Sequence, residues 1–302
     1  MNEWHDILSF LQYEQLVWYS QCSHLCHLIS ESHIQHVQWK YLGLEGCAKK
    51  GDVKGVKYLV ERCGADVHSG NDDALRTASM YGHLEVVKYL ILECGANVHA
   101  NENSSNYSAL AWASEKGHFE VVKYLVLQGG DVHENDDYPL RSASDQGHLE
   151  VVQFLIETGG ADVHAKDDSA LQWASEGGHV QLVRYLVERC GANVHANHER
   201  ALQRASRYGH LQLVKYLVEQ CGAHVYAQSG KALRNARKKG HTGVVEYLER
   251  RGTLLAMKYL VEEYGEDMHA REEDYALRLA SLFDHSKLVE YLESKGAFQA
   301  TQ

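Results

Sequence analysis

The chain has 302 residues and a formal net charge of −11, and 44% of its residues are hydrophobic. This hydrophobic content is typical of a folded chain, and the negative charge disfavours nucleic acid as a partner of the whole chain. No apolar run approaches the roughly 18 residues that cross a membrane, and residues 1–15 lack a basic region followed by an apolar core. Neither a membrane segment nor a secretory signal is therefore expected.

Residues 1–40 form the first predicted segment, which lacks the repeated pattern of the rest of the chain. The apolar residues in it are spaced to suit two or three short helices, so one interpretation is a helical cap that covers the first unit of a repeat array. A second interpretation rests on the run from Asp6 to Leu11, on the run from Ser20 to Leu28 and on Trp39, which together resemble an F-box. The two interpretations are compatible.

An F-box is a short helical motif that docks on the Skp1 adaptor of cullin-type ubiquitin ligases, so this resemblance implies a Skp1-like partner. The residues that would dock are apolar: Ile7, Leu8, Leu11, Leu16, Leu25 and Leu28. The sequence departs from the motif, because the usual Leu-Pro start is absent and Leu25 stands where a tryptophan is common.

From residue 41 onward one string recurs along the chain. It reads GHLEVVKYL at Gly82 and returns, with changes, at Gly117, Gly147, Gly178, Gly209 and Gly240, and more loosely at Gly51, Gly252 and Asp284. Successive copies start 30 to 35 residues apart, except that Gly252 follows Gly240 after 12 residues. Such a period predicts an array of stacked repeats.

Each repeat is predicted to contain two helices. In residues 178–188 the polar residues Gln181, Arg184 and Glu188 fall on one narrow stripe of a helix, and apolar residues cover the rest. A shorter helix precedes each string, such as ALRTAS from Ala74, in which the leucine and the second alanine make a small apolar face. Neither helix can bury its apolar surface alone, so neighbouring repeats must cover it.

The recurring pattern Ala-Leu-x-x-Ala-Ser-x-x-Gly-His-Leu-Glu-Val-Val-Lys-Tyr-Leu, followed by Gly-Ala-Asp-Val, resembles the ankyrin repeat over residues 41–297. The resemblance implies an all-α solenoid of about eight to nine helix-turn-helix units and a role in protein binding. Because the turns between units are short, the finger-like hairpins of the family are expected to be stunted. The particular residues used in the repeats also resemble those of ankyrin proteins of giant DNA viruses of amoebae. This resemblance implies the host cytoplasm as the location.

The array is expected to be irregular near residues 240–265, where a hairpin and a first helix are lost or a second helix is duplicated. A kink, a long helix and a local fault in the stack remain open there. The last unit, from Tyr275 to Gly296, has a more polar final helix, as a terminal cap needs, and residues 298–302 form a tail.

Neither a catalytic site nor a cofactor is predicted, and the string types that mark phosphate loops, GxSxG hydrolases or HExxH metalloproteases are absent. Thirteen of the 20 histidines recur at two repeat positions, the Gly-His turn and the hairpin, and are expected to hydrogen-bond a neighbouring backbone. No metal site is expected, because Cys63 and His68 lie too far from the next such pair and residues 22–27 scatter around a helix axis. The odd number of cysteines, seven, favours reduced thiols and a cytoplasmic protein.

The surface that is expected to bind a partner consists chiefly of the residues just before each Gly-His string. In the ankyrin family these residues and the hairpin tips line the concave face. In this chain they differ from repeat to repeat, whereas the surrounding repeat pattern stays the same. A binding surface explains this variation, and simple drift of exposed positions explains it equally well. The expected partner-binding residues are Tyr81, Lys116, Asp145, Gln146, Glu176, Arg204, Arg207, Tyr208, Lys238 and Lys239.

Charge is unevenly distributed: residues 200–251 carry 11 Lys or Arg against three Glu, or +8, which leaves −19 elsewhere. This gradient favours electrostatic steering of a protein partner over nucleic acid, since the basic segment has no clear aromatic interleaving beyond Tyr208 and the total charge is negative. The sequence therefore predicts a non-enzymatic, monomeric protein-binding module. Two hypotheses remain: a substrate adaptor for a cullin-type ubiquitin ligase through residues 1–40, or a plain scaffold or competitor with a capped end.

Overall fold

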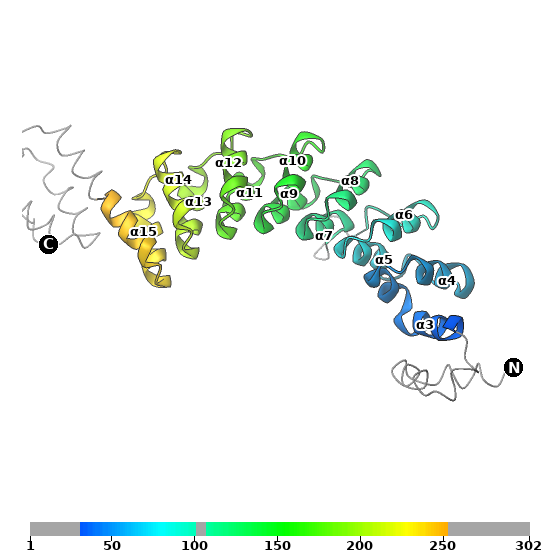
Figure 1. Cartoon of the computed structure of the whole chain (residues 1–302). Coiled ribbons are helices and arrows are strands. Elements are labelled where there is room, and N and C mark those ends of the chain that lie inside the picture. Colours follow the sequence, from blue (N-terminus) through cyan, green and yellow to red (C-terminus); the bar gives the residue numbers. More distant parts are fainter. Residues whose placement is uncertain (1–30, 101–106, 253–302) are drawn as a thin grey trace, which may run out of the picture. The chain divides into compact units, whose positions relative to one another are not determined.

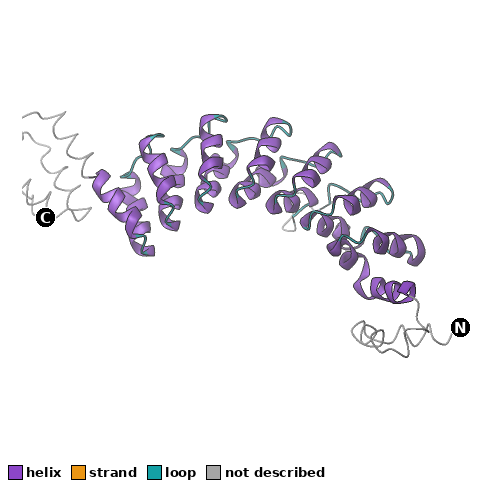
Figure 2. Cartoon of the chain, viewed as in Figure 1, coloured by secondary structure: helices purple, strands orange, loops and turns teal. Residues whose placement is uncertain are grey.

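The structure, a computed structural model, describes residues 31–100 and 107–252, with side chains from residue 35 onward. The chain divides into two compact units, residues 1–162 and residues 163–302. All regular secondary structure within the described ranges is helical (Figure 2). The predicted all-α class is confirmed, and the stunted hairpins contain no strand in these ranges.

The first unit contains successive helix pairs, which Figure 1 shows from dark blue to green. Its described helices are α3 (Glu31–Lys50), α4 (Val53–Cys63), α5 (Ser69–Met80), α6 (Leu84–Leu92), α7 (Ala109–Lys116), α8 (Phe119–Leu127), α9 (Glu134–Gln146) and α10 (Leu149–Glu157). Helices α3, α5, α7 and α9 pack in one row, and α4, α6, α8 and α10 pack in a second row. Each pair therefore covers its neighbour, as the repeat pattern predicts.

The second unit repeats this arrangement. Its helices are α11 (Ala165–Gly177), α12 (Val180–Glu188), α13 (Ala196–Tyr208), α14 (Leu211–Glu219) and α15 (Ala227–Lys239). A further helix begins at residue 242 and continues through residue 252, the last described. Helix α13 packs against α11 on one side and α15 on the other.

The burial of the helices follows the predicted stripes. In α12, Gln181, Arg184 and Glu188 are exposed, whereas Leu182, Val183 and Leu186 are buried. In the first row, the leucine of each Ala-Leu string is buried, together with the second alanine. Burial of one such leucine contributes about 2 kcal/mol, so the apolar frame holds the stack together.

A left-handed turn precedes the regular part of most first-row helices. In α9, Asn135, Asp136 and Asp137 have φ angles of 49°, 57° and 58°. Asparagine and aspartate tolerate this conformation better than other residues with a side chain. The turn bends the chain sharply and brings the third residue, Asp137, into a buried position.

Several predicted features lie outside the described residues. They are the segment 1–30, residues 253–265 of the irregular region, the last unit and the tail. No described helix is long and apolar enough to span a membrane.

Candidate functional site

The turn histidines link successive repeats within each unit. Nε2 of His148, at the start of α10, donates a hydrogen bond to the carbonyl oxygen of Glu115 in the last turn of α7, at 3.0 Å. The same bond joins His83 to Lys49, His118 to Met80, His210 to Glu176 and His241 to Arg207. The expected bond from a turn histidine to a neighbouring backbone is therefore confirmed at these positions.

In several strings the glycine provides the space for the next histidine ring, as it does at Gly51, Gly82, Gly117, Gly178 and Gly209. Gly117 ends α7 with a φ of +74°, and a Cβ added there would lie 2.4 Å from Nδ1 of His148. A side chain at this position would be strained by the backbone and would also collide with the ring. The Gly-His string thus encodes an interlock between two repeats.

Burial holds the pKa of His210 below its usual value, and the neighbouring His179 and His241 lower it further. The imidazole therefore stays neutral at pH 7, with its proton on Nε2, where it donates to Glu176. His210 thus acts as a neutral hydrogen-bond donor within the stack.

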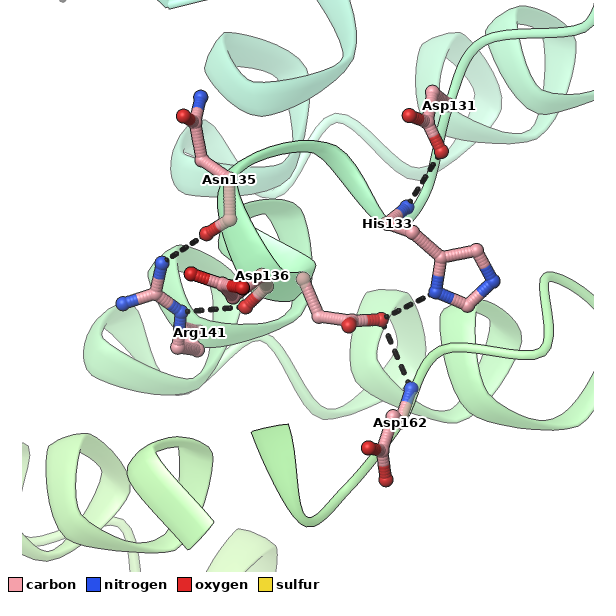
Figure 3. A network of polar contacts seen from close by, with 7 residues as sticks. Asp131, His133, Asn135, Asp136, Arg141 and Asp162 are labelled. Atoms are coloured by element: carbon pink, nitrogen blue, oxygen red, sulfur yellow. Dashed lines mark hydrogen bonds and ion pairs between the residues drawn. The ribbon is translucent and has the colours of Figure 1, made fainter. Parts of the chain in front are cut away.

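The hairpin histidines make a second kind of contact, shown in Figure 3 for His133. Its ring Nδ1 lies 3.0 Å from Oδ1 of Asp137, which also accepts from the backbone N–H of Asp162 in the next hairpin at 2.9 Å. The backbone N–H of His133 donates to Oδ1 of Asp131 at 2.8 Å. One buried carboxylate thereby joins two successive hairpins.

This hairpin network recurs with little change. His68, Asp72 and Asn97 form it in the first unit, and His164, Asp168 and Asn193 form it in the second. These histidines were predicted to hydrogen-bond a neighbouring backbone. The ring instead bonds a carboxylate four residues later. The repeated His-x-x-x-Asp spacing is the sequence signal that could have shown this.

The network changes at Glu199. A glutamate replaces the usual aspartate, and His224 stands where other repeats have aspartate or asparagine. Oε1 of Glu199 now lies 2.6 Å from Nδ1 of His195 and 2.7 Å from Nδ1 of His224. We call His195, Glu199 and His224 the His-Glu-His cluster. Sequence reasoning missed it, although the two exceptions to the repeat pattern mark its position.

In the first unit, the predicted partner-binding residues lie in or just after the last turns of α5, α7 and α9. The ring of Tyr81 is exposed, with Nζ of Lys49 5.2 Å from its centroid. Lys116 pairs with Glu115 at 2.8 Å, and Nε2 of Gln146 donates to Asp145 at 2.9 Å. These residues thus form a polar surface with one exposed aromatic ring.

In the second unit, Glu176 and Arg204 form an ion pair between α11 and α13. The structure therefore places these two predicted residues together. Arg207 and Tyr208 end α13 and are exposed, and Lys238 and Lys239 end the adjacent α15 and are also exposed. We call Arg207, Tyr208, Lys238 and Lys239 the basic patch.

The residues predicted to dock on a Skp1-like adaptor, Ile7 to Leu28, lie outside the described residues. Trp39, which contributed to the F-box resemblance, is described and is only 6% exposed. Its Nε1 donates to Asp52 at 2.6 Å, and its ring lies against Gly55 of α4. Trp39 thus belongs to the packing of the first helix pair.

Comparison with known families gives one match that covers more than half of the chain. The family described as ankyrin repeats (3 copies) matches residues 44–136 and 140–229. A search of curated proteins gave no match. Members of this family generally bind other proteins and are typically not enzymes. The chain belongs to the ankyrin-repeat family.

Proposed function

We propose that the chain binds a protein partner through the last turns of its first-row helices, and that the basic patch contacts an acidic segment of that partner. The proposal is supported chiefly by the basic patch, which places three cations and one aromatic ring on two adjacent helices. Tyrosine and arginine are the residue types that most often dominate binding energy at protein interfaces.

The charges of the basic patch are available to a partner. Lys238 and Lys239 are exposed and make no ion pair with any residue of the described ranges. Their neighbour Arg237 is already paired with Glu249 at 2.8 Å. The residues 200–251 carry a net charge of +8, which would also accelerate the approach of an acidic partner.

The first unit offers a different surface. Tyr81, Lys116, Asp145 and Gln146 combine an exposed ring with side chains of both charges, so we assign this surface to partner selection rather than to bulk attraction. Glu176 and Arg204 form an ion pair with each other. A partner that bound either side chain would have to replace this ion pair.

Charge reversal of the basic patch tests the proposal. The full-length K238E/K239E variant is expected to lose most of the specific neighbours that proximity labelling in the native cell recovers with the wild type. The matched control is K54E/K123E, which makes the same change in charge at exposed positions of α4 and α8. Equal sets of neighbours from the wild type and from K238E/K239E would refute the proposed contact.

We also propose that the partner is brought to a cullin-type ubiquitin ligase through an F-box-like segment at the amino terminus, in the cytoplasm, by a monomeric chain. The support is the sequence resemblance of Ile7, Leu8, Leu11, Leu16, Leu25 and Leu28 to adaptor-docking residues. The resemblance of the repeats to viral ankyrin proteins makes the host cytoplasm the proposed site. A plain scaffold or competitor is the alternative.

A pull-down with Skp1 separates these two functions. The intact chain is expected to recover Skp1, and a chain that begins at residue 31 is expected to recover none. The truncation stops at residue 30 because α3 contains Trp39, which the first helix pair needs for its packing. If the intact chain recovers no Skp1 either, the adaptor hypothesis is wrong and the scaffold remains.

A further inference from the structure

We propose that the His-Glu-His cluster of the second unit binds one divalent transition-metal ion of the zinc class. The ligands would be Nδ1 of His195, Nδ1 of His224 and one carboxylate oxygen of Glu199. Two imidazoles and one carboxylate are a donor set that zinc accepts with a fourth position left open.

The geometry brings these donors to one point. The ligand atoms of the three residues all lie within 4.8 Å of one another. The two imidazole rings are 4.8 Å apart between centroids and tilted by 34°. Around a tetrahedral zinc ion with bonds of about 2.0 to 2.2 Å, neighbouring donors lie roughly 3.3 Å apart. The present nitrogen–oxygen distances, 2.6 and 2.7 Å, need to open only slightly to admit the ion.

The side chains can make this adjustment. The side chains of His195 and His224 are 46% and 73% exposed, so their rings can turn without disturbing the core. The carboxylate is different, because the side chain of Glu199 is only 4% exposed. A buried carboxylate beneath two partly exposed imidazoles gives the ion access from solvent.

A second observation points to a ligand. Oε2 of Glu199 is buried and has no hydrogen-bond partner. A buried carboxylate oxygen without a partner is costly, and a cation beside it would relieve the cost. The other hairpin networks of the described ranges differ, because no second imidazole contacts the carboxylate there. Asp137 and Asp168 each bond one imidazole and one backbone N–H.

The ion would connect two successive repeats. His195 and Glu199 belong to the hairpin and first turn of α13, whereas His224 belongs to the hairpin before α15. At Asp72, Asp137 and Asp168 a hydrogen bond from a backbone N–H of the next hairpin makes this connection. Metal binding to the folded state alone raises stability by mass action, so the ion would hold these two repeats together at the starts of α13 and α15.

The test compares Zn²⁺ uptake by the metal-free full-length chain and by the H224N variant, measured by competition with a chromogenic chelator. Asparagine stands at the equivalent positions Asn97 and Asn193, so this substitution restores a residue that the hairpin accepts. The wild type is expected to bind one more equivalent of Zn²⁺ than H224N. Any Zn²⁺ held elsewhere in the chain contributes equally to both and cancels.

The matched control is H198N, which removes an exposed histidine from the same turn. Asparagine suits the left-handed backbone of residue 198, where φ is 56°. H198N is expected to keep the extra equivalent, and Zn²⁺ is expected to raise the Tm of the wild type and of H198N above that of H224N. If H224N and the wild type bind the same number of equivalents, the cluster is a hydrogen-bond network and the proposal is wrong.

Discussion

Replacing Gly117 by alanine is expected to lower the free energy of unfolding by about 2 to 4 kcal/mol. Two costs add at this position. The backbone has a φ of +74°, which an alanine adopts only with strain, and the new Cβ would lie 2.4 Å from Nδ1 of His148. The ring cannot move away without giving up its hydrogen bond to Glu115. Urea denaturation followed by circular dichroism measures the loss.

The control for this prediction is Gly95→Ala in the same unit. Gly95 also has a positive φ, +71°, but a Cβ added there meets no atom within 4 Å. Gly95→Ala therefore carries the backbone cost alone, about 1 kcal/mol. In a double-mutant cycle, H148A should relieve part of the damage caused by G117A. Equal losses for the two glycine substitutions, with no coupling to His148, would contradict the interlock.

Replacing Leu125 by alanine is expected to cost about 2 to 5 kcal/mol. Leu125 lies in α8 and is fully buried, where two rows of helices cover it. Removal of its side chain leaves a cavity, because neighbouring repeats hold their positions through many other contacts. The same denaturation experiment reports this loss.

Leu127, two residues later in α8, provides the comparison. It is 67% exposed, so Leu127→Ala is expected to change the free energy of unfolding by less than about 0.5 kcal/mol. The contrast within one helix shows whether burial between repeats, rather than helix propensity, stabilises the array. Similar effects of the two substitutions would argue against a stack held together by its apolar frame.

The repeat frame could be predicted from the sequence because it depends on local and periodic features. The spacing of Gln181, Arg184 and Glu188 determined the exposed stripe of α12, and the recurring Gly-His string located the turn between two helices. Each repeat shows the same pattern again, so the predicted helix positions do not depend on any single copy. The short turns also predicted stunted hairpins.

The hairpin contacts could not be predicted in the same way. The pair Asp136-Asp137 indicates only a polar turn, whereas the structure buries Asp137 and exposes Asp136. This difference accompanies three successive left-handed residues in the turn, which the sequence pattern does not indicate. The His-Glu-His cluster was missed for a related reason, since residues 199 and 224 come together only when two repeats stack. The partner-binding residues stay a prediction, because no contact within the chain reveals a partner.

A protein partner is proposed to bind at the last turns of the first-row helices. Hydrogen–deuterium exchange of the full-length chain, with and without the partner that the charge-reversal experiment identifies, tests it most directly. We expect slower exchange in the partner's presence at residues 204–208 and 236–240. Slower exchange confined to α12 and α14, with no change at these turns, would contradict it.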